Sequence, residues 1–367
     1  MQIQSNYSLA DLTSFHLGGP ADFFVEVNTL AELNEAIEFA KNKKLQILIL
    51  GGASNLIVSD QGFRGLVIQI NILGIEIIDR QENTVEVKVG AGEVWDQVVE
   101  WSVKAGYWGI ENLSFVPGRT GAVPVQNVGC YGQEASEVVS KVDVLDIKTQ
   151  ELKTLSREEL NFGYRTSRFN QESKNQFVIL HVYFVLSKAP KPILNYVDLK
   201  KYMETAHKTT LTLNEIREAL GEIRGYKFPD YKKMGNDGSC FKNLLLDDSE
   251  VRILDENMQK NFSADVFEKY QEIKKKFPVA GKVKMPVAFL VDICGLKGRK
   301  VGDAQLWDRQ PLVIVNTTNR AKSSDVAELF RQVRQEVFAK TGMRLSSEPE
   351  WIGFTEHELN HYLKSHE

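Results

Sequence analysis

Two glycine-rich strings constrain the fold of this chain more than any other feature. The first is LGGASNLIVSD (50–60) and the second is VPGRTGAVPVQNVGCYG (116–132). Gly51 and Gly52 end a hydrophobic run that is typical of a buried strand, so the chain turns where its side chains are smallest. Consecutive amide N–H groups in such a turn can converge on a phosphate. Either string alone is also typical of an ordinary tight turn, because short glycine motifs recur by chance.

The composition is that of a globular protein with 367 residues, 43% of them hydrophobic and 26% charged. This composition excludes a disordered or fibrous chain and leaves room for two or three compact units. The 45 basic and 49 acidic residues are well mixed, so we expect neither a nucleic acid nor a membrane as partner. Cys130, Cys240 and Cys294 are too few and scattered for a disulfide framework. No secretory leader is evident and no apolar stretch approaches the roughly 20 residues that span a bilayer, so we expect a cytoplasmic protein.

Hydrophobic periodicity predicts three α+β units along the chain. The expected strands are 21–27, 45–50, 65–70, 84–90, 142–147, 177–186 and 311–316, and the expected helices are 30–44, 93–105, 285–294 and 324–340. Ser156 with Glu159, and Thr212 with Glu215, have the spacing of a capping box and predict two further helix starts. The order of strand, helix and strand in the last unit suggests a crossover connection.

Several well-known motifs are absent or misleading. No GxGxxG follows a strand and no GxxxxGK[ST] occurs, so the Rossmann and P-loop folds lack their usual support. His357, Glu358 and His361 do spell the HExxH pattern of zinc proteases. A catalytic zinc needs three protein ligands, and only His366 or Glu367 follows to supply the third. We therefore interpret the motif as a surface helix and predict no metal site.

Both glycine strings, in this order and spacing, resemble those of the UDP-N-acetylenolpyruvoylglucosamine reductase family, which acts in peptidoglycan precursor synthesis. Three further segments look like the catalytic segments of that family: GYRTSRF (163–169), GSCFKN (238–243) and LSSEPEWIG (345–353). NYVDL (195–199) resembles a loop that occurs only in the longer of the family's two types. The resemblance extends over nearly the whole chain.

The resemblance implies an α+β fold, in which a split two-domain FAD-binding fold of the PCMH or vanillyl-alcohol-oxidase type is joined to a third α+β domain that binds the substrate. The implied domains are 1–80 and 81–226 as the two FAD-binding subdomains, 227–347 as the substrate-binding domain and 348–367 as a segment that returns to the FAD-binding part. FAD would be bound non-covalently, and NADPH would be the co-substrate. The residues implied to hold FAD are Gly51, Gly52, Ala53, Ser54, Asn55, Val116, Pro117, Gly118, Gly121, Ala122, Val125, Gln126 and Val128. Thr120, Gln126 and Asn127 carry groups that can bond to the edge of a heterocycle.

Three residues match the catalytic residues of the family. Arg165 would ordinarily make a surface ion pair, but its planar fork can also grip a carboxylate and stabilise developing negative charge. The resemblance implies that this carboxylate belongs to an enolpyruvyl group. Ser239, otherwise a turn residue, matches the serine that protonates the substrate carbon. Glu348, otherwise an exposed loop carboxylate, matches the catalytic glutamate by register, although Glu350 stands where the family commonly has an arginine.

The resemblance also implies that Tyr164, Tyr196, Lys227, Asn243 and Gln310 contact the substrate. Tyr196 would be a lid residue that bonds to a nucleotide phosphate. Lys227 lies at the spacing of the family's phosphate-binding lysine, and its ammonium group can neutralise a diphosphate.

The implied function is an FAD-dependent reductase that uses NADPH to convert UDP-GlcNAc-enolpyruvate into UDP-N-acetylmuramate, and so serves cell-wall synthesis, cell shape and cell division. We expect a monomer. Two alternatives remain open. An FAD-dependent sugar or lactone oxidase of the same fold would need the glycine strings but not Arg165, Ser239 and Glu348 together. A non-catalytic nucleotide-binding module would retain the flavin without turnover. Cys240 has no histidine nearby in sequence, so we interpret it as a buried filler.

Overall fold

The computed structural model describes residues 1–276, 278–279 and 281–364, which form two compact units. Unit 1 comprises residues 1–7, 21–53 and 64–226, and unit 2 comprises residues 8–20, 54–63 and those described from 227 onward. Two short N-terminal segments therefore belong with the C-terminal part of the chain, and the first glycine string is divided between the units after Ala53. The four domain ranges implied by the family resemblance stay predictions.

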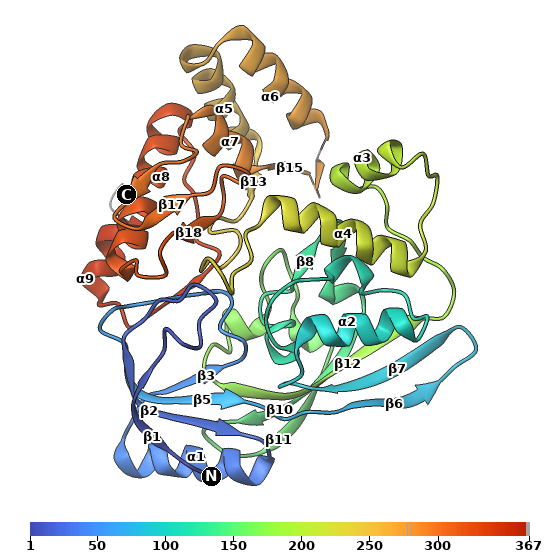
Figure 1. Ribbon diagram of the computed structural model, residues 1–367, viewed down its shortest axis with the longest axis vertical. Helices are drawn as coiled ribbons and strands as arrows, with labels where there is room; N and C mark the ends of the chain where they lie inside the picture. The colour runs from blue at the N-terminus through green and yellow to red at the C-terminus, as the bar shows by residue number, and fades with distance from the viewer. Residues whose placement is uncertain (277, 280, 365–367) are drawn as a thin grey trace. The chain divides into compact units, whose positions relative to one another are not determined.

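The first sheet of unit 1 carries the first glycine string at the end of one of its strands. Its order is β1-β2-β5-β3, with β1 at Gln4–Ser8, β2 at Pro20–Val27, β3 at Ile47–Leu50 and β5 at Phe63–Ile70. Strands β3 and β5 are parallel. Helix α1 (Leu30–Lys43) lies along this sheet and connects β2 to β3 (Figure 1). Its apolar stripe of Leu33, Ala36, Ile37 and Ala40 is buried, so Gly51 follows a strand that is fixed by packing.

The second sheet of unit 1 is antiparallel and contains the longest strands. Its order is β11-β10-β12-β7-β6, with β6 at Ile75–Arg80, β7 at Thr84–Gly90, β10 at Val139–Asp146, β11 at Leu152–Ser156 and β12 at Phe177–Ser187. The alternation of TVEVKVG is realised in β7, where Val85, Val87 and Val89 are buried. One face of the sheet therefore forms a core, as the period of two predicts.

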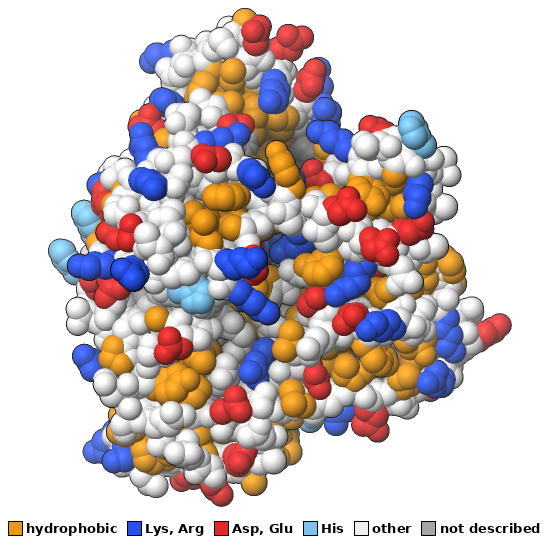
Figure 2. Space-filling view, in the orientation of Figure 1, with side chains coloured by type: hydrophobic (Ala, Val, Ile, Leu, Met, Phe, Trp, Pro, Cys, Tyr) orange, Lys and Arg blue, Asp and Glu red, His pale blue; other side chains and the backbone are white. Residues whose placement is uncertain are grey.

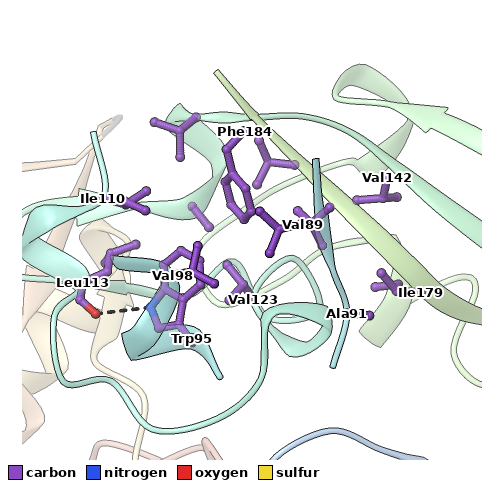
Figure 3. Packing of buried hydrophobic residues seen from close by; sticks show 14 of the residues in the cluster. Val89, Ala91, Trp95, Val98, Ile110, Leu113, Val123, Val142, Ile179 and Phe184 are labelled. Carbon is purple, nitrogen blue, oxygen red and sulfur yellow. Dashed lines mark hydrogen bonds between the residues drawn. The ribbon is translucent and has the colours of Figure 1, made fainter. Parts of the chain in front are cut away.

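Helix α2 (Trp95–Lys104) supplies the centre of that core. Trp95 is 1% exposed, and its ring centroid lies 5.6 Å from that of Phe184 on β12 (Figure 3). The indole N–H donates a hydrogen bond to the Leu113 carbonyl at 3.2 Å, so the polar edge of the ring is satisfied. This bond anchors the segment that leads into the second glycine string.

The remaining elements of unit 1 are short, apart from the helix α4. They are β8 (Gly129–Cys130), β9 (Gln133–Glu134), α3 (Val197–Thr205), α4 (Leu213–Lys227) and five 3₁₀ turns at Glu111–Leu113, Thr120–Ala122, Ala135–Glu137, Glu158–Leu160 and Arg168–Asn170. The helix start predicted at Thr212 is confirmed, because the Thr212 and Glu215 side chains each accept from the other's backbone N–H at the start of α4.

Unit 2 contains one long helix and several short strands. Its strands are β4 (Leu56–Val58), β13 (Leu244–Leu246), β14 (Pro278–Val279), β15 (Lys282–Met285), β16 (Lys300–Val301), β17 (Ala304–Leu306), β18 (Ile314–Asn316) and β19 (Glu350–Ile352). Its helices are α5 (Asp248–Asn261), α6 (Ala264–Lys276), α7 (Val287–Ile293), α8 (Ser323–Thr341) and α9 (Glu356–Leu359), with a π-helical turn at Asn360–Lys364. Phe330 of α8 is buried and stacks on Phe241 at 4.3 Å. Strand β19 pairs in parallel with β4, which joins the C-terminal part to the segment 54–63.

One sequence prediction about elements is wrong, and another is met by an element shorter than an α-helix. The capping box at Ser156 forms, with hydrogen bonds of 2.8 and 3.5 Å, but it opens only the single turn Glu158–Leu160. That turn ends at Asn161, whose φ of 49° is left-handed. The crossover predicted in the last unit does not form, because the strands before and after α7, and those before and after α8, belong to different sheets, while β16, β17 and β18 make an antiparallel meander. Gly302, with φ of 52°, lies in the two-residue turn between β16 and β17 that sets this direction.

The surface agrees with the mixed charge of the sequence. Basic and acidic side chains both occur across the face shown in Figure 2, and the formal net charge is −4. Among the residues that the structure describes, no helix combines the length and apolar character needed to cross a membrane.

Candidate active-site residues

The two glycine strings meet backbone to backbone within unit 1. A Cβ atom added at Gly52 would lie 2.6 Å from the Gly118 Cα, 2.9 Å from the Gly118 carbonyl carbon and 3.1 Å from the Arg119 nitrogen. Real side chains do not approach backbone so closely, so only glycine fits at position 52. Gly51, by contrast, leaves ordinary space toward Ala122. The strings therefore form one continuous surface of main chain.

The first string offers main-chain donors on that surface. Within the described residues, the N–H groups of Gly51, Gly52 and Ala53 meet no hydrogen-bond acceptor. Gln69 donates its side-chain N–H to the Gly51 carbonyl at 3.2 Å, which holds the turn open. Ala53 is buried with φ of 46°, a left-handed conformation that a residue with a Cβ adopts rarely. Three consecutive donors of this kind suit a phosphate or a diphosphate.

Several donors of the second string are already bonded to other parts of unit 1 or to the string itself. The N–H groups of Thr120 and Gly121 donate to the carbonyls of Glu93 and Ala91, both at 2.9 Å. A Cβ at Gly121 would lie 2.8 Å from the Ala91 Cβ, so this glycine allows close packing rather than offering a donor. Ala122 likewise donates to the Arg119 carbonyl at 3.0 Å.

Two side chains expected to face a heterocycle are committed elsewhere, so that expectation is wrong for them. Thr120 is fully buried, and its hydroxyl donates to the Glu93 carbonyl at 3.2 Å. Asn127 is also buried, and its amide donates to the Glu134 carboxylate and the Gly163 carbonyl, each at 3.0 Å. Gln126 is partly exposed and remains a prediction, as do the partly exposed Val116, Pro117, Val125 and Val128, which flank it along the second string.

Arg165 lies at the tip of a tight turn beside the second string. Gly163 and Thr166 exchange backbone hydrogen bonds of 3.0 and 3.2 Å, so Tyr164 and Arg165 are the two central residues. Arg165 has φ of 56°, a strained conformation for a non-glycine residue. Its Nη2 donates to the Gly129 carbonyl at 2.6 Å, and its guanidinium lies 5.3 Å from the Tyr164 ring centroid. The turn thus presents a fixed, half-buried cation.

The segment with Tyr196 is attached to the same region of unit 1. Tyr196 immediately precedes α3, is 43% exposed and contacts the Tyr131 ring edge to face at 5.2 Å. Buried Asn112 donates from one amide nitrogen to the carbonyls of Tyr131 and Ile193, each at 2.8 Å. The approach to Tyr196 is therefore tied to the second glycine string.

Ser239 and Glu348 are brought together in unit 2 by a short ladder of backbone hydrogen bonds. The Cys240 N–H donates to the Leu312 carbonyl at 2.7 Å, and the Glu348 N–H donates to the Cys240 carbonyl at 2.9 Å. Ser239 also forms a bridge with Val313. Segments 239–242, 312–313 and 346–348 therefore lie side by side, with the half-buried Ser239 and Glu348 on adjoining segments.

Asn55 of the first glycine string fixes the Glu348 segment. Its side-chain amide donates to the Glu348 carbonyl at 3.1 Å, and its own carbonyl accepts from Glu350 N–H at 3.0 Å. Glu350 itself is exposed in β19. Within the described residues of unit 2, Asn55 thus connects Ser54 and the rest of its string to the candidate catalytic glutamate.

The remaining predicted substrate residues have different surroundings. The Asn243 side-chain oxygen accepts from Val287 N–H at 3.0 Å and so caps α7. Gln310 lies in the turn before Val313, and its side-chain oxygen is buried with no partner among the described residues. Lys227 is the last residue of α4 and is half-buried. These placements leave the substrate roles as predictions.

Two polar residues near Ser239 were missed by the sequence analysis. The indole N–H of Trp307 is buried without a partner among the described residues. The backbone N–H of the same residue donates to the Val313 carbonyl at 2.8 Å. Asp237 is buried two residues before Ser239. Neither residue has a recognisable motif around it, because what distinguishes them is burial and contact with segments distant in sequence.

Two other sequence features with reactive side chains, Cys240 and the HExxH motif, are not candidate catalytic residues. The prediction that Cys240 is a buried filler is confirmed, since the thiol is fully buried and burial raises its pKa to about 12. The HExxH residues lie on α9 and the following π-helical turn, while His366 and Glu367 lie outside the described residues. In the described part of the chain, no group of three or more His, Cys, Asp or Glu residues is arranged to hold a metal ion.

The known proteins that are similar to this chain align with almost its whole length. Residues 21–156 match the family described as FAD binding domain, and residues 230–352 match the family described as UDP-N-acetylenolpyruvoylglucosamine reductase, C-terminal domain. A UDP-N-acetylenolpyruvoylglucosamine reductase of Bdellovibrio bacteriovorus is 35% identical over 349 residues, which cover 95% of this chain and 99% of the relative. One of Neisseria gonorrhoeae is 34% identical over 351 residues, which cover 95% and 97%.

A solved structure shows the same fold. The crystal structure of UDP-N-acetylenolpyruvylglucosamine reductase (MurB) from Thermus caldophilus aligns with a TM-score of 0.64 at 23% identity, over 96% of this chain and 98% of that one. Together with the two family matches, this confirms the predicted fold class, an α+β FAD-binding fold joined to a C-terminal α+β domain.

Proposed function

The chain belongs to the UDP-N-acetylenolpyruvoylglucosamine reductase family, and on that premise we propose how its residues divide the reaction. It is a flavin-dependent reductase of UDP-GlcNAc-enolpyruvate in peptidoglycan synthesis. The match of residues 230–352 to the C-terminal domain described for this reductase carries the conclusion. A sugar oxidase and a non-catalytic module are disfavoured, because the chain matches the reductases over 95% of its length.

The main-chain surface of the two glycine strings fits FAD as the cofactor. The unpaired N–H groups of Gly51, Gly52 and Ala53 are suited to its diphosphate, and the absence of a side chain at Gly52 keeps the surface open. FAD, when bound, supplies a redox centre that exchanges hydride with nicotinamide and with substrate. We propose NADPH as the hydride source, a monomeric state and a cytoplasmic location.

Arg165 would bind the carboxylate of the enolpyruvyl group. Reduction adds a hydride to the terminal vinyl carbon, which leaves negative charge on the carbon beside the carboxylate. A guanidinium held by the Gly129 carbonyl and the Tyr164 ring costs little further ordering when the charge develops. The strained turn at Arg165 supports this role, since strain is retained mainly at functional sites.

Ser239 would complete the reduction by donating its hydroxyl proton to the carbon that carries the charge. A serine hydroxyl is a weak acid, so the alkoxide that it leaves must be stabilised or reprotonated by neighbours or water. Glu348, one hydrogen-bonded segment away, would stabilise the charge as the protonated acid or act through a hydrogen bond. The main chain of both residues is held by hydrogen bonds, so their backbone needs little reorganisation.

The nucleotide part of the substrate would be bound by residues that do not take part in the chemistry. Lys227 and the hydroxyl of Tyr196 would contact the diphosphate. The buried side-chain oxygen of Gln310 needs a donor and would receive one from the substrate. Tyr164 and Asn243 would contact the substrate as neighbours of Arg165 and Ser239.

An anaerobic titration tests the proposal. The purified protein should show a flavin absorbance spectrum that bleaches with NADPH and recovers when UDP-GlcNAc-enolpyruvate is added. UDP-GlcNAc, which lacks the vinyl group, should restore nothing. A protein that remains colourless with excess FAD, or a reduced protein that the enolpyruvyl nucleotide fails to reoxidise, would contradict the proposed function.

A further inference from the structure

Asp237 is a buried carboxyl group whose surroundings were not predicted by any motif. Its side chain is 5% exposed, and the Ser14 hydroxyl donates to its Oδ1 at 2.6 Å. Its Oδ2 has no hydrogen-bond partner of good geometry among the described residues of the chain, although the Leu56 N–H still favours the ionised carboxylate. Ionised carboxylates are rarely buried without a cation or several donors, so this environment favours the neutral acid.

The same contact joins the turn before Ser239 to the N-terminal segment of unit 2. Asn236 N–H donates to the Ser14 carbonyl at 2.9 Å, in addition to the bond between Ser14 and Asp237. A Cβ atom at Gly235 would overlap the carbonyl oxygen of Phe15, so the two segments are in direct backbone contact. Ser14 therefore holds the turn by two hydrogen bonds of opposite direction.

Gly238 separates Asp237 from Ser239 and is the one flexible link between them. Its φ is 72°, and a Cβ placed on it would meet nothing within 4 Å. Beyond it, Cys240 is fully buried and Ser239 is paired with Val313. The position of the Ser239 hydroxyl thus depends on the buried Asp237 before it and on the buried residues Cys240 and Phe241 after it.

Burial has the largest influence on whether the Asp237 carboxyl is protonated. Burial raises the pKa of Asp237 to about 8, while the Ser14 hydroxyl and the Leu56 N–H oppose this rise. No charged group in the described part of the chain contributes to the shift. The titratable neighbour is the Cys240 thiol, which is itself buried. His16, on the segment of Ser14, has its Nε2 2.9 Å from the Tyr231 carbonyl.

We propose that Asp237 is a positioning residue, whose neutral carboxyl clamps the 235–238 turn to Ser14 and so holds the Ser239 hydroxyl in place. When the carboxyl ionises, the charge must reach water, the turn rotates about Gly238, and Ser239 leaves its position. This inference rests on the proposed function, because it takes Ser239 as the proton donor. The activity that it controls is the reoxidation half-reaction, in which the proton is transferred.

The experiment measures the two half-reactions separately between pH 6 and 10, by rapid mixing under anaerobic conditions. For a group with a pKa of about 8, the neutral fraction falls about tenfold from pH 7 to pH 9. Wild-type reoxidation by UDP-GlcNAc-enolpyruvate should fall by that factor. The Asp237→Asn variant cannot ionise and should lose this fall. Ser14→Ala removes the hydroxyl that Asp237 clamps, so it should slow reoxidation at every pH. The remaining fall should move to higher pH, because the Ser14 hydroxyl lowers the pKa of Asp237.

One variant serves as the control, and several results would overturn the proposal for Asp237. Asp230→Asn removes an exposed carboxyl from the same loop and should keep the wild-type pH profile. An Asp237→Asn variant that keeps the alkaline fall would overturn the proposal, and so would a Ser14→Ala profile unshifted or shifted to lower pH. If the Asn variant does not fold, the Ser14→Ala profile alone decides. Wild-type protein that is not reoxidised at pH 7 would overturn the proposed function as well, whereas the other outcomes leave that function standing.

Discussion

Replacing Gly52 by alanine tests whether the two glycine strings are held together by main-chain contact. The added methyl group would lie 2.6 Å from the Gly118 Cα and 2.9 Å from the Gly118 carbonyl carbon. Neither atom belongs to a side chain that can rotate away, so one string must move as a whole. Gly118 is held in place, because its carbonyl accepts a hydrogen bond of 3.1 Å from the backbone N–H of Trp95 at the start of α2.

Overpacking of this kind destabilises a protein by about 1–3 kcal/mol, which is about a fivefold to 150-fold change in the unfolding equilibrium. The neighbouring Gly51→Ala is a matched control, since its methyl group would meet the Ala122 Cβ at 3.6 Å and the Arg119 Cβ at 3.8 Å. These are ordinary van der Waals distances, so we expect the stability of that variant to remain within about 0.5 kcal/mol of wild type.

The assay is urea unfolding of both variants, followed by tryptophan fluorescence, together with the flavin-to-protein absorbance ratio after dialysis. Gly52→Ala should unfold at lower urea concentration and lose FAD, because shifting either string displaces the donors at 51–53. Equal unfolding midpoints for the two variants would refute the argument. So would a Gly52→Ala protein that retains FAD as tightly as wild type.

Three further predictions concern single residues. Ser239→Ala should leave flavin reduction by NADPH intact and slow reoxidation by the enolpyruvyl nucleotide by orders of magnitude, so equal rates in the second half-reaction would refute the assignment. Phe330→Ala should cost about 3–5 kcal/mol in urea unfolding, because the ring is 0% exposed; Ile253→Ala, at a side chain 47% exposed, should cost far less. Burial raises the pKa of Asp237 from 3.8 to about 8, so its stabilisation is complete below about pH 4 and is lost as the pH rises through 8. The stability gap between Asp237→Asn and wild type should therefore grow by about 1.4 kcal/mol per pH unit from pH 5 to 7, and a constant gap would contradict this.

Long elements with a clear period were predictable from the sequence. The alternation of apolar and polar residues in 84–90 predicts a strand, and the apolar stripe in 324–340 predicts a helix. The bounds of β7 and α8 agree with these ranges to within one residue. The predicted strand 311–316 is shorter in the structure, because Val313 N–H donates to the Gln310 carbonyl in a turn and pairing as β18 begins only at Ile314. Local sequence could not show that the preceding residues make a turn.

The side chains of the second glycine string show a different limit. Thr120 and Asn127 are polar residues among glycines, which is typical of a ligand-binding loop. Their hydrogen-bonding groups are consumed by Glu93, Glu134 and Gly163, which are 27, 7 and 36 residues away. Polar residues that hold a loop in shape and polar residues that bind a ligand look alike in sequence, and only their partners distinguish them.

Unit 2 places its two candidate catalytic residues by hydrogen bonds to the main chain, one of them from the Asn55 side-chain amide to the Glu348 carbonyl. The register of the ladder sets Glu348 against Cys240, and this register is shared by Lys242, whose N–H donates to the Ser346 carbonyl at 3.1 Å. Cys240 and Phe241 are consecutive and both fully buried, so each side chain fills a space of its own. A shift of one residue would move both side chains out of these spaces and so expose or overpack the core around Phe330. Core packing therefore fixes the register, and the register in turn fixes which glutamate and which serine are neighbours.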